Sequence, residues 1–318
     1  MSKITKVVAR QVFDSRGNPT VEAEVFSNNF SSSSICPSGA STGTFEAYEK
    51  RDINRKDYNG KSVFAAVKII NSIIAKKLKN QSVHNQEKID HILLKLDGTK
   101  QKLKLGANSM LAVSMAVKKL SSKIKKIPLY KNFLVKKNFL LPYPLMNIIN
   151  GGAHANNALQ IQEFMIRPDG AKSFKECMQI SFLTIQTLKK NLEKKKISTN
   201  VGDEGGFAPS LKSDEEAIEL IINSIEVAGF VPGKDVSICL DVAANELKKP
   251  KSVDYYLDLI NKYPIKSIED PFSEDDWKSC GKLTSKTNIQ IVGDDLFATN
   301  IKRLNKGIQN KSANAILI

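Results

Sequence analysis

Acidic residues follow three short apolar runs in the last third of the sequence. These acids are Asp241, Glu269 and Asp294, separated by 28 and 25 residues. One βα unit of a (β/α)8 barrel takes roughly 30 residues, and the active-site face of such a barrel is formed where its strands end. We therefore expect each acid at the C-terminal end of a successive parallel strand, with all three at one barrel mouth.

Three carboxylates at one barrel mouth repel each other unless a cation lies between them. A set of oxygen ligands with no nearby Cys or His suits a hard cation, and Mg²⁺ first. One acid at a strand end often only caps the next helix, but three in register predict a magnesium site formed by Asp241, Glu269 and Asp294. For Asp270 and Asp295, which directly follow two of them, we favour a capping or supporting role.

Three other segments carry residues that could take part in chemistry. The loop at 202–206 places Glu204 among glycines, which permit positive φ and close backbone approach; an acidic surface turn is the alternative. Gln162 and Glu163 end an alternating strand, where a solvated strand face would give the same pattern. His154 lies in a loop rich in Gly and Asn, so a core position is disfavoured, although a histidine without a role fits equally.

The loop at 37–44, which contains Ser41, is polar and has two glycines. It lacks the GxxxxGK[ST] spacing and the lysine of a phosphate-binding P-loop. A mobile lid is the better functional interpretation.

The elements that must position these residues fall into two domains, predicted at 1–135 and 136–318. In the first, a hairpin is followed by helices. The expected strands are 4–13, 20–26 and a weaker 30–36, and the expected helices lie near 61–78, 85–96 and 107–122.

The second domain opens with apolar runs at 144–149 and 159–166, followed by a helix at 173–195. A further helix starts at Ser213, with a capping box closed by Glu216. Strand, acid and helix then repeat, with strands at 236–240, 265–268, 289–293 and 315–318 and helices near 253–262, 274–286 and 300–310. This is an α/β pattern, and no GxGxxG turn opens it as in a dinucleotide-binding open sheet.

Composition excludes several classes of protein. The chain has 318 residues, 41% apolar and 25% charged, and its longest apolar runs are far shorter than the ~18 residues of a membrane span. No secretory signal is visible, and the four cysteines form no metal or disulfide framework. The net charge is +15, but the lysines are dispersed and aromatic residues make up only 7%, so a solvated basic surface is favoured over nucleic-acid binding.

Several specific segments resemble the enolase family, the phosphopyruvate hydratases of glycolysis. They occur in order along the whole chain: DSRGNPTVE at 14–22, PSGASTGTFEA at 37–47, NGGAHANN at 150–157, QEFMI at 162–166, VGDEGGFAP at 201–209, LDVAA at 240–244, IEDPF at 268–272 and VGDDLFATN at 292–300. The resemblance implies a small α+β lid domain followed by an enolase-like (β/α)8 barrel whose first strands depart from regular alternation.

The resemblance also implies the reaction, the removal of water from 2-phosphoglycerate to give phosphoenolpyruvate. Two Mg²⁺ ions per site assist it, because positive charge stabilises the enolate formed when a base takes the C2 proton. The implied tight metal ligands are again the three strand-end acids. Glu204 becomes the general acid with Glu163 beside it, Gln162 and His154 contact the substrate, and Ser41 reaches the second metal. A cytoplasmic homodimer is implied, and a second location at the cell surface or outside the cell stays open.

One part of the family pattern is not in these 318 residues. In enolases the lysine base follows the strand that here ends at Ile318, and the residues that hold the phosphate come later. The barrel is therefore expected to be incomplete at the C-terminus. We expect a polypeptide of residues 1–318 to bind Mg²⁺ weakly, to have little or no dehydratase activity and to be poorly soluble. The alternatives are a fragment of a full enolase, or a non-catalytic remnant that only dimerises or binds partners.

Overall fold

The structure is a computed structural model that describes residues 2–39, 43–133, 139–202 and 204–318. Its contacts divide the chain into two compact units, Met1–Gly39 with Ala47–Phe139, and Ala40–Glu46 with Leu140–Ile318. Residues 43–46 were expected in the first domain, but they pack with the second unit.

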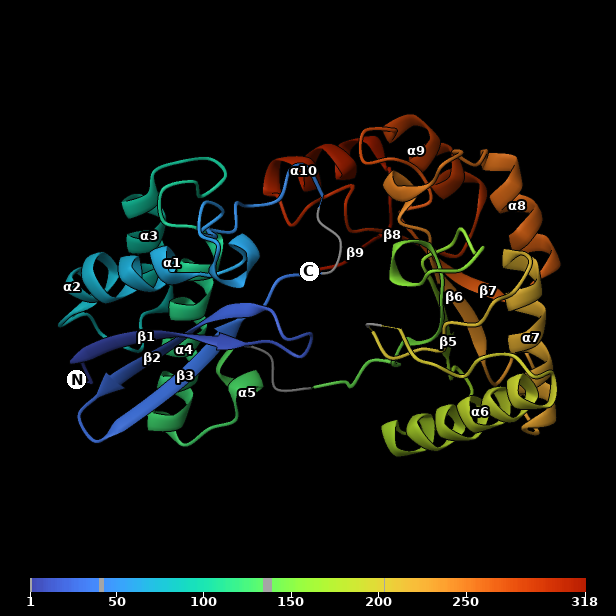
Figure 1. The fold of residues 1–318 in the computed structure, drawn as a ribbon, viewed down its shortest axis with the longest axis horizontal. Helices are drawn as coiled ribbons and strands as arrows, with labels where there is room; N and C mark the ends of the chain where they lie inside the picture. The colour runs from blue at the N-terminus through green and yellow to red at the C-terminus, as the bar shows by residue number, and fades with distance from the viewer. Residues whose placement is uncertain (1, 40–42, 134–138, 203) are drawn as a thin grey trace. The chain divides into compact units, whose positions relative to one another are not determined.

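The first unit is a three-stranded antiparallel sheet with helices packed on it (Figure 1). Its strands are β1 (Lys6–Phe13), β2 (Pro19–Ser27) and β3 (Phe30–Cys36), in the order β1-β2-β3. Asp14 closes the predicted hairpin turn, since its Oδ1 accepts hydrogen bonds from the backbone N–H groups of Arg16 and Asn18, both at 2.9 Å. The three expected strands are thus confirmed.

The predicted helices are also present in this unit. They are α1 (Phe64–Ile69), a π-helical turn (Ile70–Ile74), α2 (Ala75–Leu78), α3 (Gln86–Asp97), α4 (Ala107–Lys125) and the short α5 (Leu129–Phe133), with a 3₁₀ turn at Asp57–Gly60. The π turn interrupts the helix expected at 61–78. It carries Asn71, whose side-chain amide bonds both backbone groups of Ala9 on β1, at 2.7 and 3.0 Å.

The second unit is built on a six-stranded sheet covered by helices (Figure 1). The strands are β4 (Met146–Asn150), β5 (Glu163–Arg167), β6 (Ser237–Asp241), β7 (Ile265–Glu269), β8 (Gln290–Gly293) and β9 (Ala315–Ile316), in chain order across the sheet. β5 is antiparallel to both of its neighbours, and β6 to β9 are parallel. All five residues of β6 are buried, as expected for a strand covered on both faces.

The helices of the second unit follow the predicted alternation. They are α6 (Phe174–Lys194), α7 (Asp214–Val227), α8 (Val253–Lys262), α9 (Trp277–Lys286) and α10 (Ile301–Asn310), with 3₁₀ turns at Gly152–His154 and Ala244–Glu246. The capping interaction at Ser213 is confirmed, because its hydroxyl accepts a 3.2 Å bond from Glu216 N–H. α9 begins later than expected, since Asp276 caps it by accepting from Ser279 N–H at 3.0 Å.

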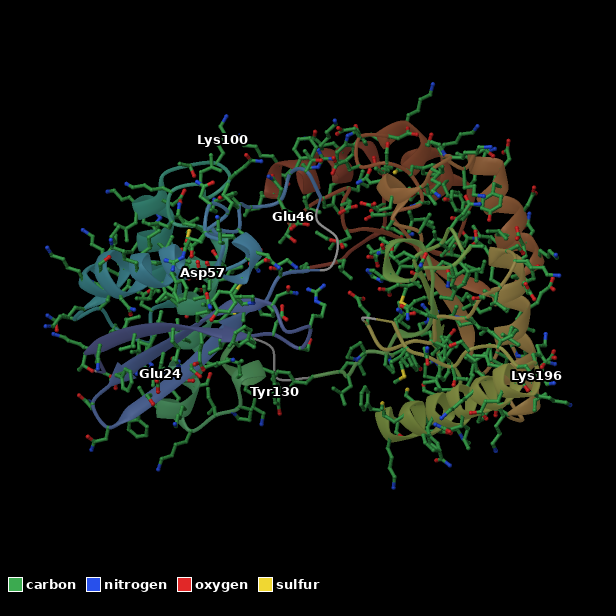
Figure 2. The ribbon with its side chains drawn as sticks, in the orientation of Figure 1. Glu24, Glu46, Asp57, Lys100, Tyr130 and Lys196 are labelled. Carbon is green, nitrogen blue, oxygen red and sulfur yellow. The ribbon has the colours of Figure 1, made fainter. Side chains whose placement is uncertain are left out.

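Among the described residues, no helix is long and apolar enough to cross a membrane. Exposed lysines occur on both units, as illustrated by Lys100 and Lys196, whose side chains extend into solvent (Figure 2).

Candidate active site and metal centre

The reversed direction of β5 brings Glu163 to the rim where the parallel strands end. Glu163 pairs with Asn150 at the end of β4 and with Asp241 at the end of β6. The expectation that Gln162 and Glu163 end a strand is therefore wrong, because Glu163 begins β5. In an antiparallel strand the first residue lies beside the last residue of its neighbours. The reversal therefore places the Glu163 side chain on the rim that carries Asp241.

The three strand-end acids lie in successive positions along the same rim. Asp241 and Glu269 are direct partners in the β6–β7 register, and Asp294 directly follows the last residue of β8. Gln162 joins them through its Nε2, which donates to Asp241 Oδ2 at 2.9 Å, while its own Oε1 is buried and has no hydrogen-bond partner. A buried amide oxygen without a partner marks a place where a ligand could donate a hydrogen bond.

His154 lies between two acids in the loop after β4. Its Nδ1 is 3.4 Å from Glu163 Oε1, and its Nε2 is 3.9 Å from Glu204 Oε1. The interaction with Glu163 raises the pKa of His154 against the opposing effect of burial, and the charge of Glu204 adds to the rise. Burial would raise the pKa of Glu163, but its interactions with His154 and Glu204 outweigh this and lower it. Glu163 is therefore held ionised.

Glycines let the loop that carries Glu204 lie directly against β4. A Cβ at Gly202 would be 2.8 Å from Asn150 Nδ2, and one at Gly206 would be 2.8 Å from the carbonyl carbon of Ile148. Asn150 uses the close approach to donate to Gly206 O at 2.6 Å. This close packing requires glycine at both positions, which explains why Glu204 lies among glycines. The loop is built against β4, as expected for a functional site and not for an acidic surface turn.

Burial and mutual repulsion raise the pKa values of the strand-end acids. Burial, followed by the charge of Glu163, raises the pKa of Asp241 to about 7. Burial, followed by the charges of Asp241 and Asp270, raises the pKa of Glu269 to about 9. Burial, followed by Asp295, raises the pKa of Asp294 to about 6. In a chain of net charge +15 this rim concentrates negative charge, and a divalent cation is the group that would relieve it.

The donor chemistry fits Mg²⁺, although the predicted ligands do not meet at one point. Among the described residues, the groups of three whose ligand atoms lie within 4.8 Å of one another are His154, Glu163 and Glu204, and Asp270, Asp294 and Asp295. The set Asp241, Glu269 and Asp294 is not one of these groups, so its joint ligation stays a prediction. Ser41, predicted to bind the second metal and the substrate, lies outside the described residues.

The group around Asp270 has a different explanation from metal binding. The Asp270 carboxylate is buried and accepts backbone N–H groups of Asp294, Asp295 and Leu296, at 3.1, 2.6 and 3.4 Å. Its oxygens are therefore occupied in fixing the loop that carries Asp294. This geometry agrees with the supporting role favoured for Asp270 on sequence grounds.

Asp270→Asn tests this role. The amide keeps one acceptor oxygen but presents an NH₂ group to a backbone N–H, which leaves a buried donor unsatisfied at a cost of about 1–3 kcal/mol. We expect a lower melting temperature and faster amide exchange in peptides spanning 293–297. Asp258→Asn, at an exposed position on α8, is the control. Unchanged exchange at 293–297 would contradict the role.

Two further residues of the site were missed by sequence reasoning. Asp214, at the start of α7, accepts the backbone N–H groups of Gln160 and Ile161 at 2.8 and 3.2 Å and so fixes the approach to Gln162. Glu46 lies close enough to Asp294 for its charge to raise the pKa of that carboxyl. No local pattern marks either of them, because both act across long sequence separations.

Two family models match this chain, one for each part of it. The model of "Enolase, N-terminal domain" matches residues 4–133, and that of "Enolase, C-terminal TIM barrel domain" matches 138–252 and 245–318. The chain belongs to the enolase family. A curated relative named Enolase, from Pelagibacter ubique (strain HTCC1062), is 61% identical over 333 residues, which cover 100% of this chain and 80% of the relative.

Membership confirms the expected fold class and function. A small α+β enolase domain precedes a barrel-type α/β domain, as the two units show separately. Enolases are carbon–oxygen lyases, the phosphopyruvate hydratases of glycolysis, and this function is favoured over a non-catalytic remnant.

Proposed function

We propose that the rim formed by β4 to β8 is the site where this enolase dehydrates 2-phosphoglycerate reversibly to phosphoenolpyruvate, with Mg²⁺ as cofactor. The observation that carries the proposal is the convergence of His154, Glu163 and Glu204 with the strand-end acids on one edge of the sheet. Asp241, Glu269 and Asp294 would hold one Mg²⁺. A second ion, with Ser41 among its ligands, rests on the resemblance alone.

The chemistry supplied by bound Mg²⁺ is stabilisation of the negative charge that develops on the substrate when its C2 proton leaves. The chain's own residues bind and orient the substrate around it. Gln162 offers a buried oxygen that lacks a partner, and His154 a ring held between two acids. Both are suited to polar groups of a small anionic substrate.

Glu204 is the proposed proton donor to the departing 3-hydroxyl. It interacts with Glu163, which His154 keeps ionised, so the two carboxyl groups and the histidine form one cluster. The Glu204 side chain is 41% exposed and that of Glu163 is 14% exposed, which leaves Glu204 accessible to a leaving group. Glu163 lies beside Glu204 in this cluster and is the second catalytic residue of the proposal.

The proposed function is tested by following phosphoenolpyruvate through its ultraviolet absorbance. The assay uses the full-length protein, with either Mg²⁺ or EDTA. We expect turnover with Mg²⁺ and none with EDTA. Turnover that is insensitive to EDTA would contradict the metal assignment, and absence of turnover with Mg²⁺ would contradict the proposed reaction.

The folding stability of the metal-free protein should depend on pH, because the pKa values of three acids are raised to about 6 for Asp294, 7 for Asp241 and 9 for Glu269. The unfolded chain loses these protons near pH 4, before the folded chain does, so stability without metal falls as pH rises from about 4 toward these values. Mg²⁺ binds the ionised form and reverses the loss. The melting temperature with Mg²⁺ should exceed that in EDTA by a margin that widens from pH 5 to 9, and a constant margin would contradict it.

We also propose, from family membership, that the protein is a homodimer in the cytoplasm. Light scattering coupled to size-exclusion chromatography tests the first point. A monomer at micromolar concentration would contradict it.

A further inference from the structure

Residues 43–46, which include the last two residues of the predicted lid at 37–44, are held by hydrogen bonds within the second unit. Thr44 N–H donates to Glu274 Oε2 at 3.1 Å, and Gly43 N–H donates to Glu46 Oε1 at 2.8 Å. A Cβ at Gly43 would lie 3.0 Å from Asp295 Oδ1, so the backbone approaches the loop after β8 closely. Figure 2 labels Glu46 on this segment.

Arg303 of α10 contacts the aromatic side chain of this segment, Phe45. Its side chain is only 11% exposed, and its guanidinium carbon lies 4.0 Å from the ring centre of Phe45 and 4.9 Å from that of Trp277. The planar cation therefore contacts two aromatic rings, an arrangement that favours Arg over Lys. Burial of a charge in this place requires partners for its N–H groups.

The same guanidinium bonds the loops that follow β7 and β8. Nε donates to Leu296 O at 2.8 Å, Nη2 donates to Glu274 O, and Nη1 donates to Asp275 Oδ1 at 3.2 Å. Arg303 thereby joins the segment of Phe45 to two of the loops that directly follow predicted metal ligands.

The loop after β6 enters the same network through Asn245. Its Oδ1 accepts from Glu274 N–H at 3.0 Å, and its Nδ2 donates to Asp295 Oδ2 at 3.0 Å. Glu274 is thus bonded to Thr44, Arg303 and Asn245 at once. These contacts connect residues 43–46 with the loops after β6, β7 and β8.

We propose that Arg303 is a positioning residue that, stacked between Phe45 and Trp277, fixes residues 43–46 onto the loops after β6, β7 and β8. Its meaning for catalysis rests on the proposed function, because residues 37–44 are the predicted lid. The attachment itself depends on neither metal nor substrate. It can therefore be tested separately from the reaction.

Hydrogen exchange of the Thr44 amide in the full-length protein is the direct test. Arg303→Gln and Phe45→Leu should each accelerate exchange in peptides covering 43–46 by roughly tenfold, since each removes one side of a buried cation–π contact. The double variant should exchange no faster than the faster single variant, because both changes break one contact. Peptides of β5 and β6 should exchange as in the parent.

Lys306→Gln is the matched control. Lys306 lies on the same helix, with Nζ 4.3 Å from the ring centre of Trp277. The hydrogen bonds of the Gly43 and Thr44 amides and the cation contact of the Phe45 ring are made by other residues. We expect parental exchange at 43–46 in this variant. The emission of Trp277, the chain's single tryptophan, should shift in Phe45→Leu through the displaced Arg303.

Unchanged exchange at 43–46 in Arg303→Gln, or additive effects in the double variant, would overturn the proposal. If Arg303→Gln also accelerates exchange in β5 and β6, Phe45→Leu becomes the deciding variant, because it leaves the charge and its hydrogen bonds in place. Parental exchange in Phe45→Leu would then overturn the proposal. If the parent protein protects the Thr44 amide and both variants lose this protection, but the parent forms no phosphoenolpyruvate, the proposed function fails and the attachment by Arg303 stands.

Discussion

Asp241→Asn should raise the dissociation constant for Mg²⁺ by roughly a hundredfold or more. Replacing residues that merely support metal ligands already costs about 10–100-fold in affinity, and Asp241 is assigned as a ligand. In EDTA above pH 7 the same change should raise the melting temperature. Burial and the charge of Glu163 raise the pKa of Asp241 to about 7, so a neutral side chain removes a repulsion that the folded chain bears.

The opposite signs of the two effects make this experiment decisive. A variant that simply misfolds would lose both Mg²⁺ affinity and stability, whereas a metal ligand in a repulsive cluster loses affinity alone. Titration calorimetry with Mg²⁺ measures the affinity, and thermal unfolding in EDTA measures the stability, on separate portions of the same protein preparation. Asp258→Asn on α8 should change neither. Parental Mg²⁺ affinity in Asp241→Asn would remove Asp241 from the metal site.

Much of the second unit could be predicted because its parallel strands are buried on both faces. Such strands appear as short apolar runs, and the acid after each run marks where the strand ends. The spacing of Asp241, Glu269 and Asp294 therefore predicted three neighbouring positions on one rim, which the strand register bears out. Helix starts with a side-chain cap, as at Ser213, were equally visible.

The direction of β5 could not be obtained in the same way. Alternation of polar and apolar residues shows which side chains share a face, but it is identical for a strand read forward or backward. Glu163 was therefore placed at the wrong end of its strand, although the reversed direction is what brings it to the rim.

Residues that act across long sequence separations were hidden for a related reason. Asp270 fixes a loop 24 to 26 residues away, and Arg303 contacts Phe45 in a segment predicted to belong to the other domain. Only the packed structure identifies their partners. The site acids were predictable as a set, whereas the residues that hold their loops were not.

Glu204→Gln should lower kcat for phosphoenolpyruvate formation by about 10²- to 10⁴-fold, the range expected when a general acid is removed. The amide keeps the size of the side chain but cannot supply a proton to the departing hydroxyl. Because Glu204 is partly exposed and its loop is held by Gly202, Gly206 and Asn150, the fold should be retained. The assay uses protein from the complete reading frame.

The split between kcat and KM distinguishes a proton donor from a residue that only binds. A donor acts in the transition state, so kcat and kcat/KM should fall together while KM changes little. Glu226→Gln, on the exposed face of α7, is the matched control and should keep both constants. If Glu204→Gln turns over at the parental rate, the proton comes from another group. A rise in KM alone would place Glu204 in substrate binding, because the interaction lost would then be equally strong in the ground state and the transition state.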